Sequence, residues 1–98
     1  MTIEIKKNAT ETTIEIVGRL DTITAPALDK TINEDIGETK NLVLDIKGLE
    51  YISSAGLRVL LSAQKKMKQK GTMVVKNVCA EIMDVFEITG FADILTIN

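Results

Sequence analysis

Two adjacent hydroxyl side chains are the groups in this sequence whose type and position are best suited to chemistry. Ser53 and Ser54 precede Ala55 and Gly56, and an apolar helical pattern begins directly after them. The first turn of a helix presents unpaired N–H groups and a partial positive charge, which stabilise a bound or covalent phosphate. Because Ala55 and Gly56 lack bulky side chains, the backbone of a partner could approach closely here. The pattern is typical of a capping serine, and it also fits a serine that is phosphorylated.

A second polar loop, Asp21–Thr24, follows the second predicted strand. In open α/β sheets, functional residues gather in loops at the carboxyl ends of parallel strands. This loop and the loop Tyr51–Leu57, which contains the two serines, both have this position. Asp21 is more typical of a turn or a side-chain cap than of a site residue. Thr24 is predicted to cap the helix that follows, with Pro26 tolerated in the first turn.

Hydrophobic patterning indicates the elements that position these loops. Alternation with period two predicts strands, apolar stripes with helical spacing predict helices, and glycines mark the ends of the helices. Residues 47–50 are predicted as a loop. In chain order, the predicted elements are a strand at 2–6, a strand at 13–17, a helix at 24–36, a strand at 42–46, a helix from 53 or 54 to 70, a strand at 72–76, a helix at 80–89 and a strand at 94–97.

This order, β-β-α-β-α-β-α-β, predicts an α/β fold. Strands that alternate with helices after an N-terminal hairpin imply a mixed, mostly parallel sheet with three to four helices. A chain of 98 residues has room for one domain, so residues 1–98 are predicted to form a single unit.

Composition excludes several kinds of function. The sequence has no histidine and one cysteine, Cys79, which excludes histidine-based catalysis and zinc sites built from Cys and His. No cofactor or metal is therefore expected. The 12 basic and 14 acidic residues give a net charge of -2, which does not favour direct nucleic-acid binding. The lysine cluster Lys65–Lys70 is predicted to be a solvated face.

Three features favour a cytoplasmic protein without a membrane span. Residues 1–7 alternate between apolar and polar and lack the apolar segment of a signal peptide. No apolar run approaches the ~20 residues that a spanning helix requires. Cys79, as the single cysteine, cannot form an internal disulfide, which fits a reducing compartment.

Four segments carry a resemblance to a known family. Residues Tyr51–Leu61 resemble the signature segment of STAS domains, and most of all that of the stand-alone bacterial anti-sigma factor antagonists. Gly18–Asp21, Leu42–Asp45 and Val85–Phe91 agree with the same family, in the same order along the chain. The resemblance covers essentially the whole sequence and implies the STAS fold.

The resemblance implies a function in partner switching. In such antagonists, the unmodified protein binds an anti-sigma factor that is also a serine kinase, and thereby frees the sigma factor. The kinase phosphorylates a serine at the start of the second helix, the modified antagonist dissociates, and a serine phosphatase resets it.

The position that matches the phosphorylated serine is Ser54. Asp21 matches an acidic residue near the phosphoserine and the kinase contact. Many members have an acidic residue directly before the phosphorylated serine, whereas this chain has Ser53, which leaves the partner and the modified hydroxyl open. The full set of expected partner-binding residues is Asp21, Thr22, Thr24, Ser53, Ser54, Gly56, Leu57 and Arg58.

Two other interpretations remain. A non-enzymatic STAS module could serve another signalling or lipid-transport complex, because a fold does not determine its partner. An enzyme is poorly supported, since no histidine is available as a base for Ser54. The expectation is a binding protein that is the substrate of a kinase and has no catalytic activity of its own.

Overall fold

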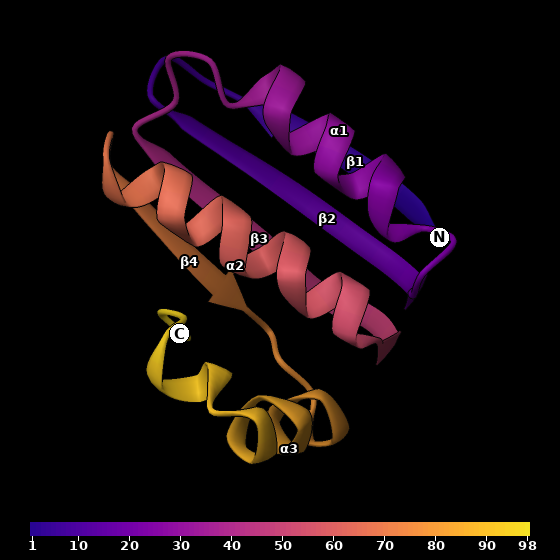
Figure 1. The fold of residues 1–98 in the computed structure, drawn as a ribbon. Coiled ribbons are helices and arrows are strands. Elements are labelled where there is room, and N and C mark those ends of the chain that lie inside the picture. The colour runs from indigo at the N-terminus through magenta and orange to yellow at the C-terminus, as the bar shows by residue number, and fades with distance from the viewer.

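A computed structural model describes all residues from 1 to 98 as one mixed sheet with helices (Figure 1). The strands lie side by side in the order β1-β2-β3-β4. The first pair is an antiparallel hairpin and the other two pairs are parallel, so the predicted α/β class and sheet type are confirmed. The strands are β1 (Thr2–Lys7), β2 (Glu11–Leu20), β3 (Asn41–Ile52) and β4 (Thr72–Lys76).

Three α-helices and one short 3-10 helix complete the fold. They are α1 (Ala25–Asp35), α2 (Ser54–Lys68), α3 (Ala80–Thr89) and η1 (Phe91–Asp93). Helices α1 and α2 lie side by side across one face of the sheet, while α3 and η1 lie beyond β4 (Figure 1). The core between sheet and helices contains 22 buried apolar residues, mostly isoleucine and leucine. No helix is both long and apolar enough to cross a bilayer.

Strand β3 is longer than the sequence pattern predicts. Residues 47–50, predicted as a loop, continue the strand to Ile52, and Gly48 and Leu49 among them pair with β2. Two shifts of register occur along this pairing, after which Arg19 lies opposite Tyr51. These irregularities let the strands remain hydrogen-bonded although the simple alternation of apolar residues is interrupted. Leu49, which is 2% exposed, still reaches the core.

The predicted final strand at 94–97 is wrong in its extent. After η1, the backbone N–H groups of Ile94 and Leu95 both donate to the carbonyl oxygen of Phe91, at 3.0 and 2.8 Å. Ile94 and Leu95, which the sequence pattern assigned to the strand, therefore belong to this turn. A single parallel bridge, Val75 to Ile97, is what remains of the pairing with β4.

The amino-terminal edge of the sheet consists of residues 8–12, 36–41 and 69–72, where β2, β3 and β4 begin. The hydroxyls of Thr12 and Thr39 are buried and lie 2.6 Å apart in a hydrogen bond. Gly71 is in such close contact with Lys40 that a Cβ atom would lie 1.8 Å from the carbonyl oxygen of Lys40. Lys70 donates through Nζ to carbonyl oxygens at the end of α1. The groups at this edge are thus engaged by contacts within the chain.

Candidate functional site

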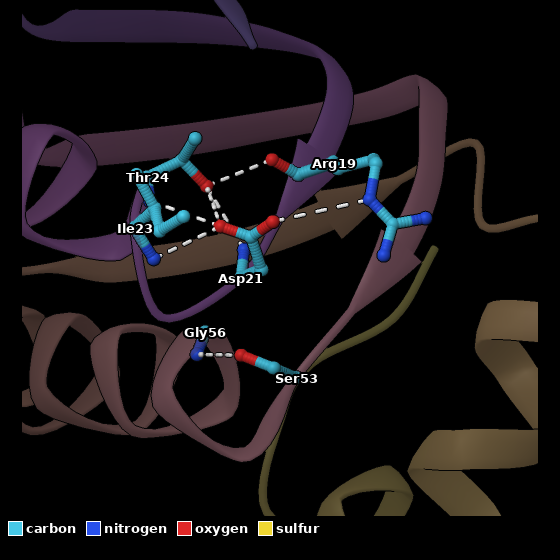
Figure 2. Close-up of polar contacts among 6 residues, drawn as sticks. All are labelled: Arg19, Asp21, Ile23, Thr24, Ser53 and Gly56. Carbon is cyan, nitrogen blue, oxygen red and sulfur yellow. Dashed lines mark hydrogen bonds and ion pairs between the residues drawn. The ribbon is translucent and has the colours of Figure 1, made fainter.

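The two predicted loops lie side by side at the opposite edge of the sheet. Leu20 pairs with Ile52 in parallel register, and the N–H of Ser53 donates to the carbonyl oxygen of Leu20 at 2.9 Å. The ends of β2 and β3 therefore place the start of α1 beside the start of α2 (Figure 2). We refer to residues 19–24 and 51–58 as the carboxyl-terminal edge.

Asp21 organises the first loop. Its Oδ1 atom accepts hydrogen bonds from the backbone N–H groups of Ile23, at 3.0 Å, and Thr24, at 3.1 Å (Figure 2). The Thr24 hydroxyl donates to the carbonyl oxygen of Arg19 at 2.8 Å and accepts from the N–H of Asp21 at 2.9 Å. Thr24 thus holds the predicted N-cap position of α1, but its hydroxyl makes no capping bond because the loop engages it.

The carboxylate of Asp21 is stabilised in its charged form. The hydrogen bond from the backbone N–H of Thr24 is the main cause that lowers the pKa of Asp21, and the N–H of Ile23 adds to it. Partial desolvation opposes this shift, and the guanidinium of Arg19, with Nε 3.9 Å from Oδ2, supports it. At neutral pH this edge therefore carries a fixed negative charge in the loop beside the start of α2.

The two serines have different structural roles. Ser53 is the N-cap of α2, and its Oγ accepts a hydrogen bond from the N–H of Gly56 at 3.3 Å (Figure 2). Ser54 is the first residue of α2, and it is exposed. No hydrogen bond engages its hydroxyl, whereas that of Ser53 is used by the fold. Ser53, and not Ser54, therefore caps α2.

Gly56 and Leu57 are buried in the fold. A Cβ atom on Gly56 would lie 2.7 Å from Cγ of Leu20 and 2.9 Å from Cγ1 of Ile52. The glycine therefore lets α2 pack closely on β2 and β3, and the space that we expected a partner's backbone to use is filled by the protein itself. Leu57 is 6% exposed and belongs to the core. These two residues shape the edge without presenting side chains to solvent.

The other predicted interface residues are accessible. Thr22 and Arg58 are exposed, and Asp21, Thr24 and Ser53 are partly exposed. Together with Ser54, they surround the junction of the two loops. The structure thus brings together six of the eight expected residues as accessible groups.

Three accessible residues of this edge were missing from the predicted set. Ile23 is 87% exposed, which is unusual for an isoleucine in a folded domain. Arg19 and Tyr51 stack, with the guanidinium carbon 4.2 Å from the ring centroid. The sequence did offer one indication that Ile23 is exposed. It lies between two threonines in a loop that has neither helical nor strand periodicity. The stacked pair depends on the register of β2 and β3, which the sequence does not reveal.

A hollow of about 450 Å³ lies elsewhere, on the surface of β2 and β3. There the Asp45 carboxylate accepts hydrogen bonds from the side-chain amide of Asn77 at 3.0 Å and the N–H of Lys47 at 3.1 Å. The bond from Asn77 is the main cause that lowers the pKa of Asp45. None of the expected site residues line the hollow, which is formed by Glu15, Ile16, Val17, Asp45, Lys47 and Gly48.

Comparison with known proteins agrees with this architecture. Residues 2–98 match the STAS domain family. The anti-sigma-B factor antagonist of Listeria monocytogenes is 31% identical over 101 residues, covering 100% of this chain and 89% of the relative. The anti-sigma-B factor antagonist of Bacillus subtilis is 28% identical over 97 residues, covering 98% and 89%. The chain therefore belongs to the STAS domain family, in its group of anti-sigma factor antagonists.

Solved structures share the fold. An anti-sigma factor antagonist from Mycobacterium paratuberculosis superposes with a TM-score of 0.88 at 22% identity, covering 98% of this chain and 83% of that chain. The Bacillus cell fate determinant SpoIIAA in its phosphorylated form gives a TM-score of 0.76 at 16% identity, covering 99% and 91%. At these identities the comparison establishes the common fold.

Proposed function

We propose that this protein is an anti-sigma factor antagonist that acts by partner switching. The unphosphorylated form binds an anti-sigma factor with serine kinase activity and frees the sigma factor. Phosphorylation of Ser54 releases the anti-sigma factor, and a serine phosphatase restores the binding form. The protein is the substrate of this cycle and contributes no catalysis, in the cytoplasm where sigma factors act.

The observation that carries this proposal is the contrast between the two serines. Ser54 is exposed at the first position of α2 and its hydroxyl has no partner, so a kinase can reach it without disturbing the fold. Ser53 is half-buried and its Oγ is engaged by the N–H of Gly56. A kinase would have to reach an Oγ that is half-buried and already engaged in this bond. The geometry thus favours Ser54 as the acceptor.

A phosphate on Ser54 would change the interface more than the fold. It adds about -1.5 to -2 charges at neutral pH. The unpaired N–H groups and partial positive charge at the start of α2 stabilise such a group within the protein. Across an interface, the same charge together with the ionised Asp21 repels an acidic surface, and its desolvation against an apolar surface is costly. Release therefore requires no rearrangement of the core.

A phosphorylation assay tests this proposal. The purified protein is incubated with ATP and the kinase-type anti-sigma factor of the same organism, and then analysed by intact mass and peptide fragmentation. We expect one phosphate on Ser54, none on the Ser54→Ala variant, and continued modification of a Ser53→Ala control. The absence of modification would contradict the partner switch, and a phosphate confined to Ser53 would contradict the assignment of the acceptor.

A further inference from the structure

The stacked pair of Arg19 and Tyr51 has no role in the core. The two residues lie opposite each other near the ends of β2 and β3, and both are exposed, the Arg19 side chain to 60% and Tyr51 to 42%. The next residues along each strand, Leu20 and Ile52, are the ones that enter the core. The pair therefore lies on the accessible surface of the carboxyl-terminal edge.

Two contacts hold the guanidinium of Arg19 in place. The ring of Tyr51 covers its face at 4.2 Å from the centroid. On the other side, Oδ2 of Asp21 lies 3.9 Å from Nε, as Figure 2 shows for these two residues. A guanidinium that stacks on an aromatic ring gains a favourable cation–π interaction and loses freedom of rotation. Asp21 is itself fixed by the backbone of its loop, so the guanidinium has a contact on two sides, of which the stacking on Tyr51 is the closer.

The two terminal nitrogens of Arg19 remain without partners. No hydrogen bond or ion pair within the chain engages either Nη atom, and in Figure 2 the contact with Asp21 is made through Nε alone. Paired N–H donors in one plane match the two oxygens of a carboxylate. Because stacking on Tyr51 already restricts the guanidinium, less conformational freedom is lost when such a group binds than for an unstacked arginine.

The position of the pair connects it to the expected interface. Arg19 contacts Asp21, and Ile23 in the same loop exposes 87% of its surface. Arginine and tyrosine are the residue types most often found among the strong contacts of protein interfaces. An oriented Arg–Tyr pair directly beside the loops is thus suited to recognise a partner.

We propose that Arg19, oriented by Tyr51, binds the carboxylate of an aspartate or glutamate on the anti-sigma factor and thereby selects the partner. This inference rests on the proposed function. A carboxylate fits better than a phosphate, because Arg19 is a single cation whose Nε side already faces Asp21. Arg19 is the contacting residue, and Tyr51 is a positioning residue.

Binding measurements with the unphosphorylated protein and the cognate kinase-type anti-sigma factor test this inference. The variants are Arg19→Ala, Arg19→Lys, Tyr51→Leu and Tyr51→Phe. Lys65→Ala is the matched control, since Lys65 is exposed farther along α2 and has no ion pair. Dissociation constants are measured by calorimetry at low and high salt, and thermal unfolding confirms that each variant is folded.

We expect Arg19→Ala and Arg19→Lys each to weaken binding about tenfold or more, because lysine keeps the charge but not the paired donors. Tyr51→Leu should weaken binding several-fold, and Tyr51→Phe, which retains the ring, should stay within about twofold of the parent protein, as should the control. Arg19→Ala should also reduce the dependence of the affinity on salt.

Two results would overturn the inference while the proposed function stands. In the first, the parent protein binds and all Arg19 variants bind equally well. In the second, Arg19→Lys binds like the parent, which would show that charge alone matters. If the parent protein itself does not bind, the proposed function fails, and the inference that rests on it fails as well.

Discussion

The two edges of the sheet contain similar residues and use them in opposite ways. At the amino-terminal edge, the hydroxyls of Thr12 and Thr39 are buried and bonded to each other. At the carboxyl-terminal edge, the hydroxyl of Ser54 is exposed and has no partner, and Ile23 extends into solvent. At both edges polar groups complete the fold, but only the carboxyl-terminal edge also leaves an exposed hydroxyl, that of Ser54, without a partner.

This difference shows where the protein can change without unfolding. Groups that are buried and paired contribute to stability, since leaving one partner unsatisfied costs about 1–3 kcal/mol. Groups that are exposed and unpaired can be modified or bound at little cost to the fold. The proposed switch by phosphorylation would therefore act at the carboxyl-terminal edge, and substitutions at the other edge should affect stability first.

The largest effect is expected at the amino-terminal edge, for Gly71→Ala. The new Cβ would lie 1.8 Å from the carbonyl oxygen of Lys40, which accepts the N–H of Thr72 at 2.8 Å and cannot move freely. We expect a loss of about 3 kcal/mol in the free energy of unfolding, measured by denaturant titration. Gly37→Ala is the control, because nothing lies within 4 Å of its Cβ position. Equal stability of the two variants would show that the close contact between Gly71 and Lys40 is not required for the fold.

A smaller effect should separate the two serines. Ser53→Ala removes the capping bond to Gly56 and should lower the free energy of unfolding by about 1 kcal/mol. Ser54→Ala removes an exposed hydroxyl without partners and should change it by less than about 0.5 kcal/mol. Denaturant titrations of both variants give the comparison. If Ser54→Ala were the more destabilising, the assigned roles of the serines would be reversed.

The smallest effect concerns the pH dependence of stability. The pKa of Asp21 is lowered in the folded protein, so its contribution is present above the unfolded value of about 3.9 and is lost as the pH falls through the folded value. Asp21→Asn should therefore narrow the difference in stability between neutral pH and about pH 3. Asp84→Asn, on the exposed side of α3, is the control. A pH profile of Asp21→Asn that matches the parent protein would contradict the role of the loop hydrogen bonds.

Much of the fold could be predicted because its signals are local. The ranges of β4 and α3 agree with the sequence pattern, since each element lies between clear turn or glycine signals. The extension of β3 through residues 47–50 could not be predicted, because it depends on pairing with β2 across two shifts of register. The prediction of a last strand at 94–97 was wrong for a similar reason. The N–H groups of Ile94 and Leu95 donate to the carbonyl oxygen of Phe91 in η1, so these residues do not pair with β4.

The position of the two loops in the fold could be predicted, but their detailed packing could not. The predicted loops Asp21–Thr24 and Tyr51–Leu57 do follow neighbouring parallel strands at one edge of the sheet, although Tyr51 and Ile52 still belong to β3. That Gly56 faces Leu20 follows from the packing of α2 on the sheet, which local sequence does not specify. The orientation of Arg19 depends likewise on its cross-strand neighbour.

The affinity of the anti-sigma factor for the two forms of this protein tests the central claim most directly. Unmodified and fully Ser54-phosphorylated protein are compared by calorimetry, with circular dichroism and thermal unfolding to assess the fold. We predict that phosphorylation weakens binding by about 100-fold or more while the fold remains intact, and that Ser54→Asp does so in part. Equal affinities of the two forms, or unfolding of the phosphorylated form, would contradict a local switch at Ser54.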